Sequence, residues 1–596
     1  MDLYSIKTPH FLNQMNNDDL TELSNDIRTF LIESISKTGG HLASNLGVVE
    51  LTIALHKVFN TPKDKLIFDV GHQIYTHKIL TGRINSFNTL RQFKGLSGFP
   101  KMSESFYDAF ETGHSSTSIS AATGMVVANE NANNPSEVVA VIGDGAMTGG
   151  MAFEAINYFG HSGKKMIIVL NDNEMSISDN VGALSKLLKG LRSSKKYIGF
   201  KNIVPRFIKR PMNKITNALK YTIEGTNIFE TLGYKYYGPV DGHNIPKLIK
   251  YLELAKNETR PVIIHIKTKK GKGYEPAENN QVKYHGIGYY EVENGNTPKK
   301  GLSWSVGISE TINEVVKDTL TVITPAMIHG SGLQVFKDRQ LIDVGIAEGH
   351  ATTMAAGIAA SHQKVYLPLY STFAQRAYDQ ILHDIARPNL HVVFGIDRAG
   401  LVPNDGDTHQ GIFDVSMFNA MPNMTITMPK DLNEARELIK YGFYKNDSPF
   451  VIRYPKGETY LGKTSTEIDK PSWVIEEKGS EVNIISYGPD VNRILKLVIN
   501  NNIQANVINA RFIKPMDLKV LDEVISNELP ILIYENVVES GSLGQTIQSY
   551  IAEKTYRKVK RMFVESIPEH GDISNLLREQ GLDDTSIINE IKKLCA

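Results

Sequence analysis

Short apolar runs recur along the chain, and longer amphipathic stretches separate one run from the next. The clearest runs cover residues 138–143, 165–171, 261–268, 391–397, 482–488 and 531–536. Such runs are typical of strands buried on both faces, and the stretches between them have the length of helices that connect parallel strands. No repeat of solenoid period accompanies this pattern. The sequence therefore predicts an α/β fold built on parallel sheets.

Two polar stretches punctuated by Gly and Pro, residues 286–302 and 455–481, are typical of linkers. The chain has 596 residues, which is enough for about two to four domains of ordinary size. We therefore predict three α/β domains, with boundaries 1–300, 301–475 and 476–596.

Charge and cysteine usage exclude several classes of protein. The 65 Lys and Arg residues balance 65 Asp and Glu residues, so the chain lacks the basic excess of proteins that coat nucleic acid. Cys595 is the single cysteine, which excludes a disulfide framework and favours a reducing compartment. Neither a leader sequence nor an apolar run of the ~18 residues that span a bilayer is expected. We expect a soluble, cytoplasmic protein that binds neither nucleic acid nor membrane.

One stretch departs from this balance of charge. Between Ala183 and Lys220 the chain carries eleven Lys and Arg residues and no acid. Runs of like charge are usually solvated, which favours an insertion over an active site. The alternative is capture of anionic ligands, or nonspecific RNA contact, by long-range electrostatic attraction.

Acidic and amide side chains follow two of the predicted strands. Gly143-Asp144-Gly145 comes directly after the apolar residues 138–142, and Asn171-Asp172-Asn173 comes directly after residues 165–170. The interval from Asp144 to Asn173 (173 − 144 = 29 residues) fits one crossover helix plus one strand, so both side chains should reach the carboxyl edge of the sheet. The glycines and the helix N-terminus suit a phosphate group, and the two oxygens suit Mg²⁺.

This pair of motifs resembles the signature of thiamine diphosphate enzymes. Over nearly the whole chain, further stretches resemble the 1-deoxy-D-xylulose-5-phosphate synthase family, which is related to transketolase. The matching stretches are 41–56, 68–83, 112–125, 238–243, 268–278, 346–351, 370–380, 397–401 and 408–411. The resemblance implies an α/β fold of three domains: a diphosphate- and Mg²⁺-binding domain, a pyrimidine-binding domain and a smaller C-terminal domain like that of transketolase. It also implies a homodimer.

The resemblance assigns the cofactor residues. It implies that Asp144, Asn173 and the carbonyl of Met175 hold Mg²⁺ on the diphosphate. The implied thiamine diphosphate residues are His72, Gly113, His114, Ser115, Gly145, Ala146, Asn173, Lys270, Glu348 and Phe373. Phe373 would stack on the pyrimidine ring, although its spacing alone indicates only a core residue.

Glu348 resembles the activating glutamate of thiamine enzymes. From its position alone, Glu348 would be a solvated loop residue, and the resemblance reverses that interpretation. A carboxyl group bonded to a pyrimidine nitrogen promotes loss of the thiazolium proton, which is cofactor chemistry oriented by protein. Such a carboxyl group works best when burial raises its pKa.

The substrates implied by the resemblance, pyruvate and D-glyceraldehyde 3-phosphate, are anions. His41, His72 and His114 recur in Gly- or Ser-rich motifs and suit proton transfer, because imidazole titrates near neutral pH. Arg398 and Arg453 follow strand-like runs and resemble a phosphate clamp. The other implied substrate residues are Arg91, Tyr370, Asp405 and His409. The implied catalytic residues are Glu348, His41, His72 and His409.

The predicted reaction is decarboxylation of pyruvate and ligation to D-glyceraldehyde 3-phosphate, giving 1-deoxy-D-xylulose 5-phosphate and CO₂ for isoprenoid and thiamine biosynthesis. The alternatives are a transketolase, the decarboxylating component of a 2-oxoacid dehydrogenase, and a binding protein on a decayed enzyme fold. The last predicts loss of Asp144, Asn173 or Glu348, and all three are present. Departures from the family pattern are Asn45, where a glycine is usual, an acid at Asp407, and a shortened stretch at 566–574.

Overall fold

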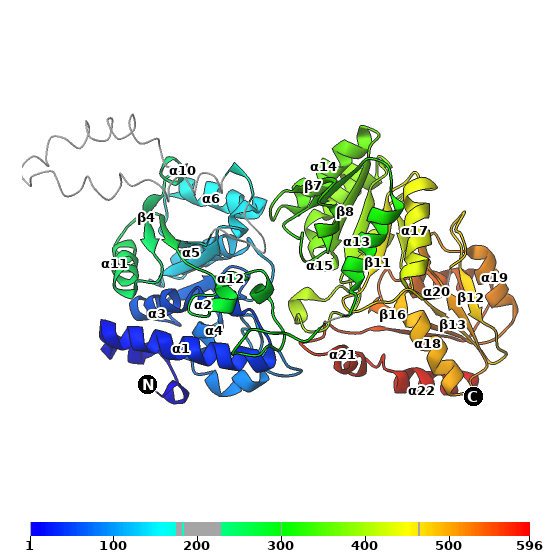
Figure 1. Cartoon of the computed structure of the whole chain (residues 1–596), viewed down its shortest axis with the longest axis horizontal. Coiled ribbons are helices and arrows are strands. Elements are labelled where there is room, and N and C mark those ends of the chain that lie inside the picture. The colour runs from blue at the N-terminus through cyan, green and yellow to red at the C-terminus, as the bar shows by residue number, and fades with distance from the viewer. Residues whose placement is uncertain (1, 174–180, 184–227, 300, 463–464) are drawn as a thin grey trace, which may run out of the picture. The chain divides into compact units, whose positions relative to one another are not determined.

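The computed structural model of the chain (Figure 1) describes residues 2–173, 181–183, 228–299, 301–462 and 465–596. Met175 and nearly all of the basic stretch lie outside these residues. Contacts within the chain define two compact units: unit 1 is residues 1–90 and 96–297, and unit 2 is residues 91–95 and 298–596. The two units are described separately below.

Unit 1 is built on a five-stranded parallel sheet in the order β1-β2-β3-β5-β4. Its strands are β1 (Lys65–Phe68), β2 (Val138–Gly143), β3 (Ile167–Asp172), β4 (Lys235–Asp241) and β5 (Val262–Lys267). Because β2 and β3 are neighbours and pair Gly143 with Asn171, the motifs that follow them start from the same edge.

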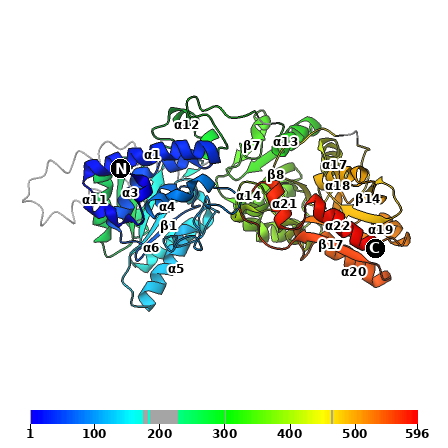
Figure 2. The ribbon, with the colours of Figure 1, turned by 90° about the horizontal axis from the view of Figure 1, so that it is seen from below.

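Helices cover both faces of this sheet, as Figure 2 shows with α1 and α3 on one side of β1 and α5 and α6 on the other. Alternate residues of β2 enter two different cores: Val139 and Val141 pack with α1, α3 and α11, whereas Val138 and Ala140 pack with α5 and α6. The helices of unit 1 are α1 (Asn17–Thr38), α2 (Leu42–Leu46), α3 (Val49–Val58), α4 (Tyr75–Leu80), α5 (Ser118–Asn131), α6 (Gly150–Ser162), α10 (Ile228–Thr231), α11 (Ile245–Lys256) and α12 (Glu275–Asn279).

Unit 2 contains a seven-stranded sheet in the order β15-β10-β11-β9-β8-β6-β7, parallel except for β15. Its strands are β6 (Leu320–Thr324), β7 (Gln340–Asp343), β8 (Lys364–Tyr370), β9 (Val393–Asp397), β10 (Thr425–Thr427), β11 (Phe450–Tyr454) and β15 (Phe512–Lys514). The accompanying helices are α13 (Trp304–Val315), α14 (Glu348–Ala360), α15 (Ser371–Ala374), α16 (Asp414–Asn419) and α17 (Leu432–Tyr444).

A second sheet of unit 2 has five strands in the order β12-β14-β13-β16-β17, with β12 antiparallel to β14. Its strands are β12 (Val474–Glu477), β13 (Val482–Ser486), β14 (Ala505–Asn509), β16 (Ile531–Val538) and β17 (Val559–Val564). Its helices are α18 (Pro489–Asn500), α19 (Leu518–Ser526), α20 (Leu543–Lys554), α21 (Ile573–Glu579) and α22 (Asp584–Cys595). Directly after β14, the chain adds β15 to the edge of the first sheet, so the two sheets of unit 2 share one continuous core.

The predicted α/β class and the predicted strands are confirmed. The six apolar runs named above correspond to β2, β3, β5, β9, β13 and β16. Among the helices that the structure describes, none is long and apolar enough to cross a membrane.

Candidate active site

Asp144 lies just beyond the end of β2 and is 3% exposed. Its backbone N–H donates to the carbonyl of Asn171 at 3.1 Å, which joins the two predicted motifs. Asp144 interacts electrostatically with the buried Lys270. Burial lowers the pKa of Lys270 to about 8, and the negative charge of Asp144 opposes that fall. Asn173 follows β3 and is partly buried.

These residues fit a magnesium diphosphate group. A side chain built on Gly143 would meet no atom within 4 Å, so the strand end is open enough for a phosphate to approach. Within the described residues, no three His, Cys, Asp or Glu side chains gather as a metal site. With Asp144 and Asn173 as side-chain ligands, Mg²⁺ would take its remaining ligands from phosphate, water and backbone carbonyls, as it commonly does.

The loop that carries Gly113, His114 and Ser115 is fixed by a buried acid. Asp69, directly after β1, accepts hydrogen bonds from the backbone of Ser116 at 2.8 Å and from the side chain of Ser118 at 2.7 Å. The hydroxyl of Ser116 donates to the carbonyl of Ala146 at 2.8 Å. The loop is thus held against the Gly145–Ala146 turn.

Three histidines form a cluster in unit 1. The ring centroids of His41 and His72 lie 5.4 Å apart, and that of His285 lies 5.9 Å from His41 and 5.2 Å from His72. Burial and the charge of Lys270 lower the pKa of His72 to about 3, and the same causes hold the pKa of His285 well below its usual value. The rings of His72 and His285 are therefore neutral near pH 7. Sequence reasoning missed His285, which lies one residue before the stretch 286–302 that was interpreted as a linker.

Asn45 fixes the backbone of this cluster. Its side-chain amide donates to the carbonyls of His41 and His72 at 2.9 and 2.8 Å, and its oxygen accepts from the N–H of Tyr75 at 2.8 Å. A glycine at this position, as expected in relatives, could not make these three bonds. The departure noted in the sequence thus has a structural role next to the histidines.

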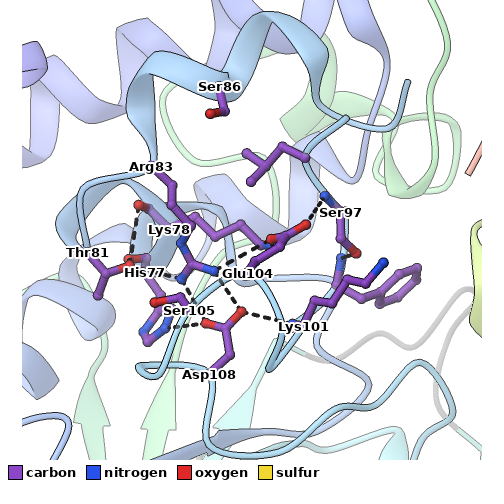
Figure 3. A network of polar contacts seen from close by, with 12 residues as sticks. His77, Lys78, Thr81, Arg83, Ser86, Ser97, Lys101, Glu104, Ser105 and Asp108 are labelled. Atoms are coloured by element: carbon purple, nitrogen blue, oxygen red, sulfur yellow. Dashed lines mark hydrogen bonds and ion pairs between the residues drawn. The ribbon is translucent and has the colours of Figure 1, made fainter. Parts of the chain in front are cut away.

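A buried ionic network lies beside the cluster (Figure 3). Arg83 donates to both carboxylate oxygens of Asp108 at 2.7 Å, and His77 lies 3.0 Å from the same acid. Lys78, which is fully buried, pairs with Glu104 at 2.6 Å. Charges this deep in a protein are stable only when paired and hydrogen-bonded.

The two acids of this network also hold a loop. Asp108 accepts from the backbone N–H of Lys101 at 2.8 Å, and Glu104 accepts from that of Ser97 at 2.7 Å. Between these anchors lies Phe99, whose ring centroid is 5.6 Å from that of His41. The network therefore positions an aromatic wall of the histidine cluster.

Replacing Asp108 with asparagine is expected to lower the free energy of unfolding by about 3–5 kcal/mol, because Arg83 and His77 would lose a buried acid. Thermal unfolding measures this, with Glu130→Gln as a control that removes one partner of an exposed pair with Lys164 and should cost less than about 1 kcal/mol. Burial would raise the pKa of Asp108, but His77 and Arg83 outweigh it and hold that pKa below its usual value. The stabilisation by Asp108 is therefore present above about pH 4 and lost as the pH falls. Equal stability of the two variants would contradict this assignment.

In unit 2, Glu348 is the first residue of α14 and is 6% exposed. Burial raises its pKa, and the charge of Arg376, whose Nη1 lies 4.0 Å from Oε2, only partly opposes the rise. Glu348 therefore has the buried, protonatable carboxyl group that the resemblance requires.

Aromatic rings line the strand ends of the same sheet. Tyr370 ends β8, and its ring stacks on that of Phe373 at 5.2 Å between centroids. The guanidinium carbon of Arg398 lies 3.7 Å from the centroid of Tyr370, and Nη1 of Arg398 lies 2.9 Å from Asp397. The ring of His409 meets that of Phe373 edge-on at 5.8 Å. The structure thus brings these four predicted residues together.

A cluster of cations surrounds one acid next to these rings. Lys456 lies 2.7 Å and Arg91 3.6 Å from carboxylate oxygens of Asp405. Burial would raise the pKa of Asp405, but Lys456, His409, Arg91 and Arg398 together hold it below its usual value. We call Arg91, Arg398, Asp405 and Lys456 the cation cluster. Asp397 also pairs with Arg398, so three cations face two acids, and the single positive charge in excess suits a phosphate group.

The structure does not place Arg453 in this cluster. Arg453 is 1% exposed, and its Nε and Nη2 each lie 2.9 Å from the carboxylate of Asp414. Its remaining nitrogen contacts the sulfur of Met428 at 3.2 Å, so every nitrogen of the guanidinium has a buried partner. Lys456, which sequence reasoning missed, is the third cation of the cation cluster.

Comparison with known proteins identifies the family to which the chain is similar. Residues 3–268 match the profile described as 1-deoxy-D-xylulose-5-phosphate synthase, residues 300–460 match the transketolase pyrimidine-binding domain, and residues 472–587 match the transketolase C-terminal domain. The chain is 48% identical to a 1-deoxy-D-xylulose-5-phosphate synthase from Macrococcus caseolyticus, over 100% of this chain and 99% of that protein. It is 47% identical to one from Geobacillus sp., over 100% and 99%, and 46% identical to one from Listeria welshimeri, over 100% and 98%.

Proposed function

Since the chain belongs to the 1-deoxy-D-xylulose-5-phosphate synthase family, we propose how its own residues carry out that reaction. The protein is a transferase that uses thiamine diphosphate and Mg²⁺ to join pyruvate, after loss of CO₂, to D-glyceraldehyde 3-phosphate. The product is 1-deoxy-D-xylulose 5-phosphate, which enters isoprenoid biosynthesis. The observation that carries this function is the identity of 48% to a relative over the whole chain.

Unit 1 would hold the charged end of the cofactor. Asp144 and Asn173, with the carbonyl of Met175, would bind Mg²⁺, and the backbone at Gly145 and Ala146 would approach the diphosphate. Gly113, His114 and Ser115 would complete the binding loop. Lys270 supports this assignment because its buried ammonium group interacts electrostatically with Asp144.

Glu348 would hold a proton at a pyrimidine nitrogen of the cofactor, and Phe373 would pack on that ring. When bound, thiamine diphosphate supplies an electron sink for the bonding pair that stays behind when the C–C bond of pyruvate breaks and CO₂ leaves. Burial raises the pKa of this carboxyl group, which favours its protonated form and suits it to share a proton with a basic nitrogen.

The histidines would donate and accept protons and hydrogen bonds around the substrates. A neutral imidazole carries one donor and one acceptor nitrogen, so His41 and His72 could polarise a carbonyl oxygen or take up a proton. His409 would act similarly in unit 2, where burial lowers its pKa to about 4. The apolar and aromatic surroundings of these rings would exclude water, which would otherwise protonate the reacting carbon of the donor.

The cation cluster would bind the phosphate of the acceptor. Arg398 offers a planar fork for phosphate oxygens, and its stacking on Tyr370 fixes the plane of that fork. Lys456 and Arg91 add charge, while Asp405 holds both side chains in place. This proposal gives Lys456 the part that the sequence suggested for Arg453.

A pair of variants tests that reassignment. Lys456→Met is expected to raise the KM for D-glyceraldehyde 3-phosphate about 10- to 100-fold, because a charged hydrogen bond to the phosphate is lost. Arg453→Met is expected to leave that KM unchanged while lowering stability by about 3–5 kcal/mol, because Asp414 would be buried without its cation. Steady-state kinetics and thermal unfolding of both variants decide the matter, and the reverse pattern would restore Arg453 to the phosphate site.

Product analysis by NMR tests the function itself. Purified protein with thiamine diphosphate, Mg²⁺, labelled pyruvate and D-glyceraldehyde 3-phosphate is expected to give labelled 1-deoxy-D-xylulose 5-phosphate, and omission of either cofactor is expected to abolish it. A ketose phosphate donor in a parallel tube is the control. Consumption of the ketose without reaction of pyruvate would instead identify a transketolase.

We also propose a cytoplasmic homodimer as the working form. The dimer is implied by the family, and its mass can be measured by sedimentation equilibrium, where a monomer at micromolar concentration would contradict the proposal. The single cysteine, Cys595, is consistent with a reducing compartment.

A further inference from the structure

A segment near the C-terminus reaches the cation cluster from a different sheet of unit 2. Residues 568–571 lie between β17 and α21, and the carbonyl of Gly571 accepts from the N–H of Asn404 at 2.9 Å. Asn404 in turn accepts from Arg91 through its carbonyl oxygen. The segment therefore contacts the loop that carries Asp405. This is the same stretch in which the sequence departs in length from the family pattern.

His570 in this segment is buried, with 8% of its surface exposed. A side chain built on Gly406 would lie 3.4 Å from its Nδ1, so the ring packs closely against the loop next to Asp405. Gly406 has φ of +85°, a conformation that other residues rarely adopt, which keeps this surface free of a side chain.

The other ring nitrogen of His570 has no hydrogen-bond partner within the part of the chain that the structure describes. A buried polar atom without a partner lowers stability, so its retention calls for an explanation such as a ligand. The charges that act on the ring belong to Arg91, Asp405 and Lys456, all members of the cation cluster. Burial and the two cations lower the pKa of His570 to about 3, so the ring is neutral and carries one N–H donor.

We propose that His570 is a further substrate-binding residue, whose Nε2 donates a hydrogen bond to the phosphate group of the aldehyde acceptor. The C-terminal domain then takes part in substrate recognition directly. A neutral donor adds a directional contact to the charge of Arg91, Arg398 and Lys456 without adding a fourth cation beside them. This inference rests on the proposed acceptor site and extends it by a residue outside its sheet.

The test compares two acceptors, D-glyceraldehyde 3-phosphate and unphosphorylated D-glyceraldehyde. His570→Ala is expected to raise the KM for the phosphorylated acceptor about tenfold and to leave kcat/KM for D-glyceraldehyde and the KM for pyruvate unchanged. Ile567→Ala, which shortens an exposed side chain earlier in the same connection between β17 and α21, is the control and should change neither the KM for the phosphorylated acceptor nor that for pyruvate.

Two conservative variants identify the atom. His570→Gln can place an amide N–H near the position of Nε2 and should restore most of the affinity, whereas His570→Asn places its amide near Nδ1 and should not. This pair also carries the test if His570→Ala fails to fold. Equal losses with both acceptors would indicate a purely structural role and overturn the inference, as would an unchanged KM or a selective loss that glutamine does not rescue. Absence of product with the unaltered protein would overturn the proposed function instead.

Discussion

Glu348→Gln is expected to lower kcat about 10²- to 10⁴-fold, since the amide cannot exchange a proton with the cofactor ring. The same change should not unfold the protein. Burial raises the pKa of Glu348, so at neutral pH the folded state bears the cost of keeping this group buried, and that cost grows as the pH rises above about 4. The neutral amide removes it, so the Tm at pH 7 should stay level or rise. Loss of activity with gain of stability is typical of a functional group held in a costly environment.

A second buried acid of unit 2 gives the matched control for this experiment. Glu434 is 1% exposed, and burial raises its pKa to about 7 against the opposing charges of Lys430 and Arg511. It lies in the first turn of α17 and accepts from the side chain of Asn509 at 2.8 Å. Glu434→Gln should therefore leave kcat near that of the unaltered protein. If Glu348→Gln retained full turnover, or if both variants lost it equally, Glu348 would have no special part in the reaction.

The strands that the sequence predicted, such as β2 and β13, have apolar runs that are buried on both faces. Others give no comparable signal for physical reasons. β7 is only half-buried, so its residues 340–343 form no continuous apolar run. β15 has three residues and exists because it pairs with β10, which lies far away in the sequence. Such strands depend on tertiary contacts and not on local pattern.

The site residues also differ in whether a local sequence pattern or only tertiary contacts indicate their position. Asp144 belongs to a local motif at the end of a strand, where spacing alone indicates its position, whereas Glu348, at the start of α14, was identified only through the family resemblance. Lys456 and His570 lie in irregular segments and His285 ends a short 3-10 helix, and only the folded chain brings these residues to other polar groups. No spacing in the sequence could have revealed them.

Arg453 shows how a strand boundary decides the role of a residue. Both Arg398 and Arg453 follow apolar runs, which suggested two equivalent residues at strand ends. Arg398 does lie one residue past the end of β9, but β11 continues through Tyr454 and keeps Arg453 inside the sheet. Because successive side chains of a strand point to opposite faces, Arg453 is directed to Asp414 in the core. Lys456 lies two residues past the end of β11, outside the sheet.

Asp144→Asn is expected to weaken the binding of thiamine diphosphate by on the order of 10²-fold or more in the presence of Mg²⁺, since a direct ligand should matter more than the 10- to 100-fold typical of its supporting residues. Titration calorimetry with Mg²⁺, and again with a chelator, separates the metal from the rest of the site. The unaltered protein should bind the cofactor much more tightly with Mg²⁺, whereas the variant should show little difference, because the coupling between metal and cofactor requires this carboxylate.

The charge of Lys270 gives that experiment a second readout. In the unaltered protein, the charge of Asp144 opposes the effect of burial on the pKa of Lys270. Removal of that charge should therefore lower the pKa of Lys270 further below about 8. Residual cofactor binding by Asp144→Asn should then weaken as the pH rises from 6 to 8, because Lys270 loses its proton and with it the attraction for diphosphate. Glu154→Gln, which removes an exposed acid on the helix that follows Asp144, should leave both the Mg²⁺ dependence and the pH dependence unchanged. If Asp144→Asn kept the full Mg²⁺ dependence, the metal would have to be held elsewhere, and the two motifs at the ends of β2 and β3 would serve the fold alone.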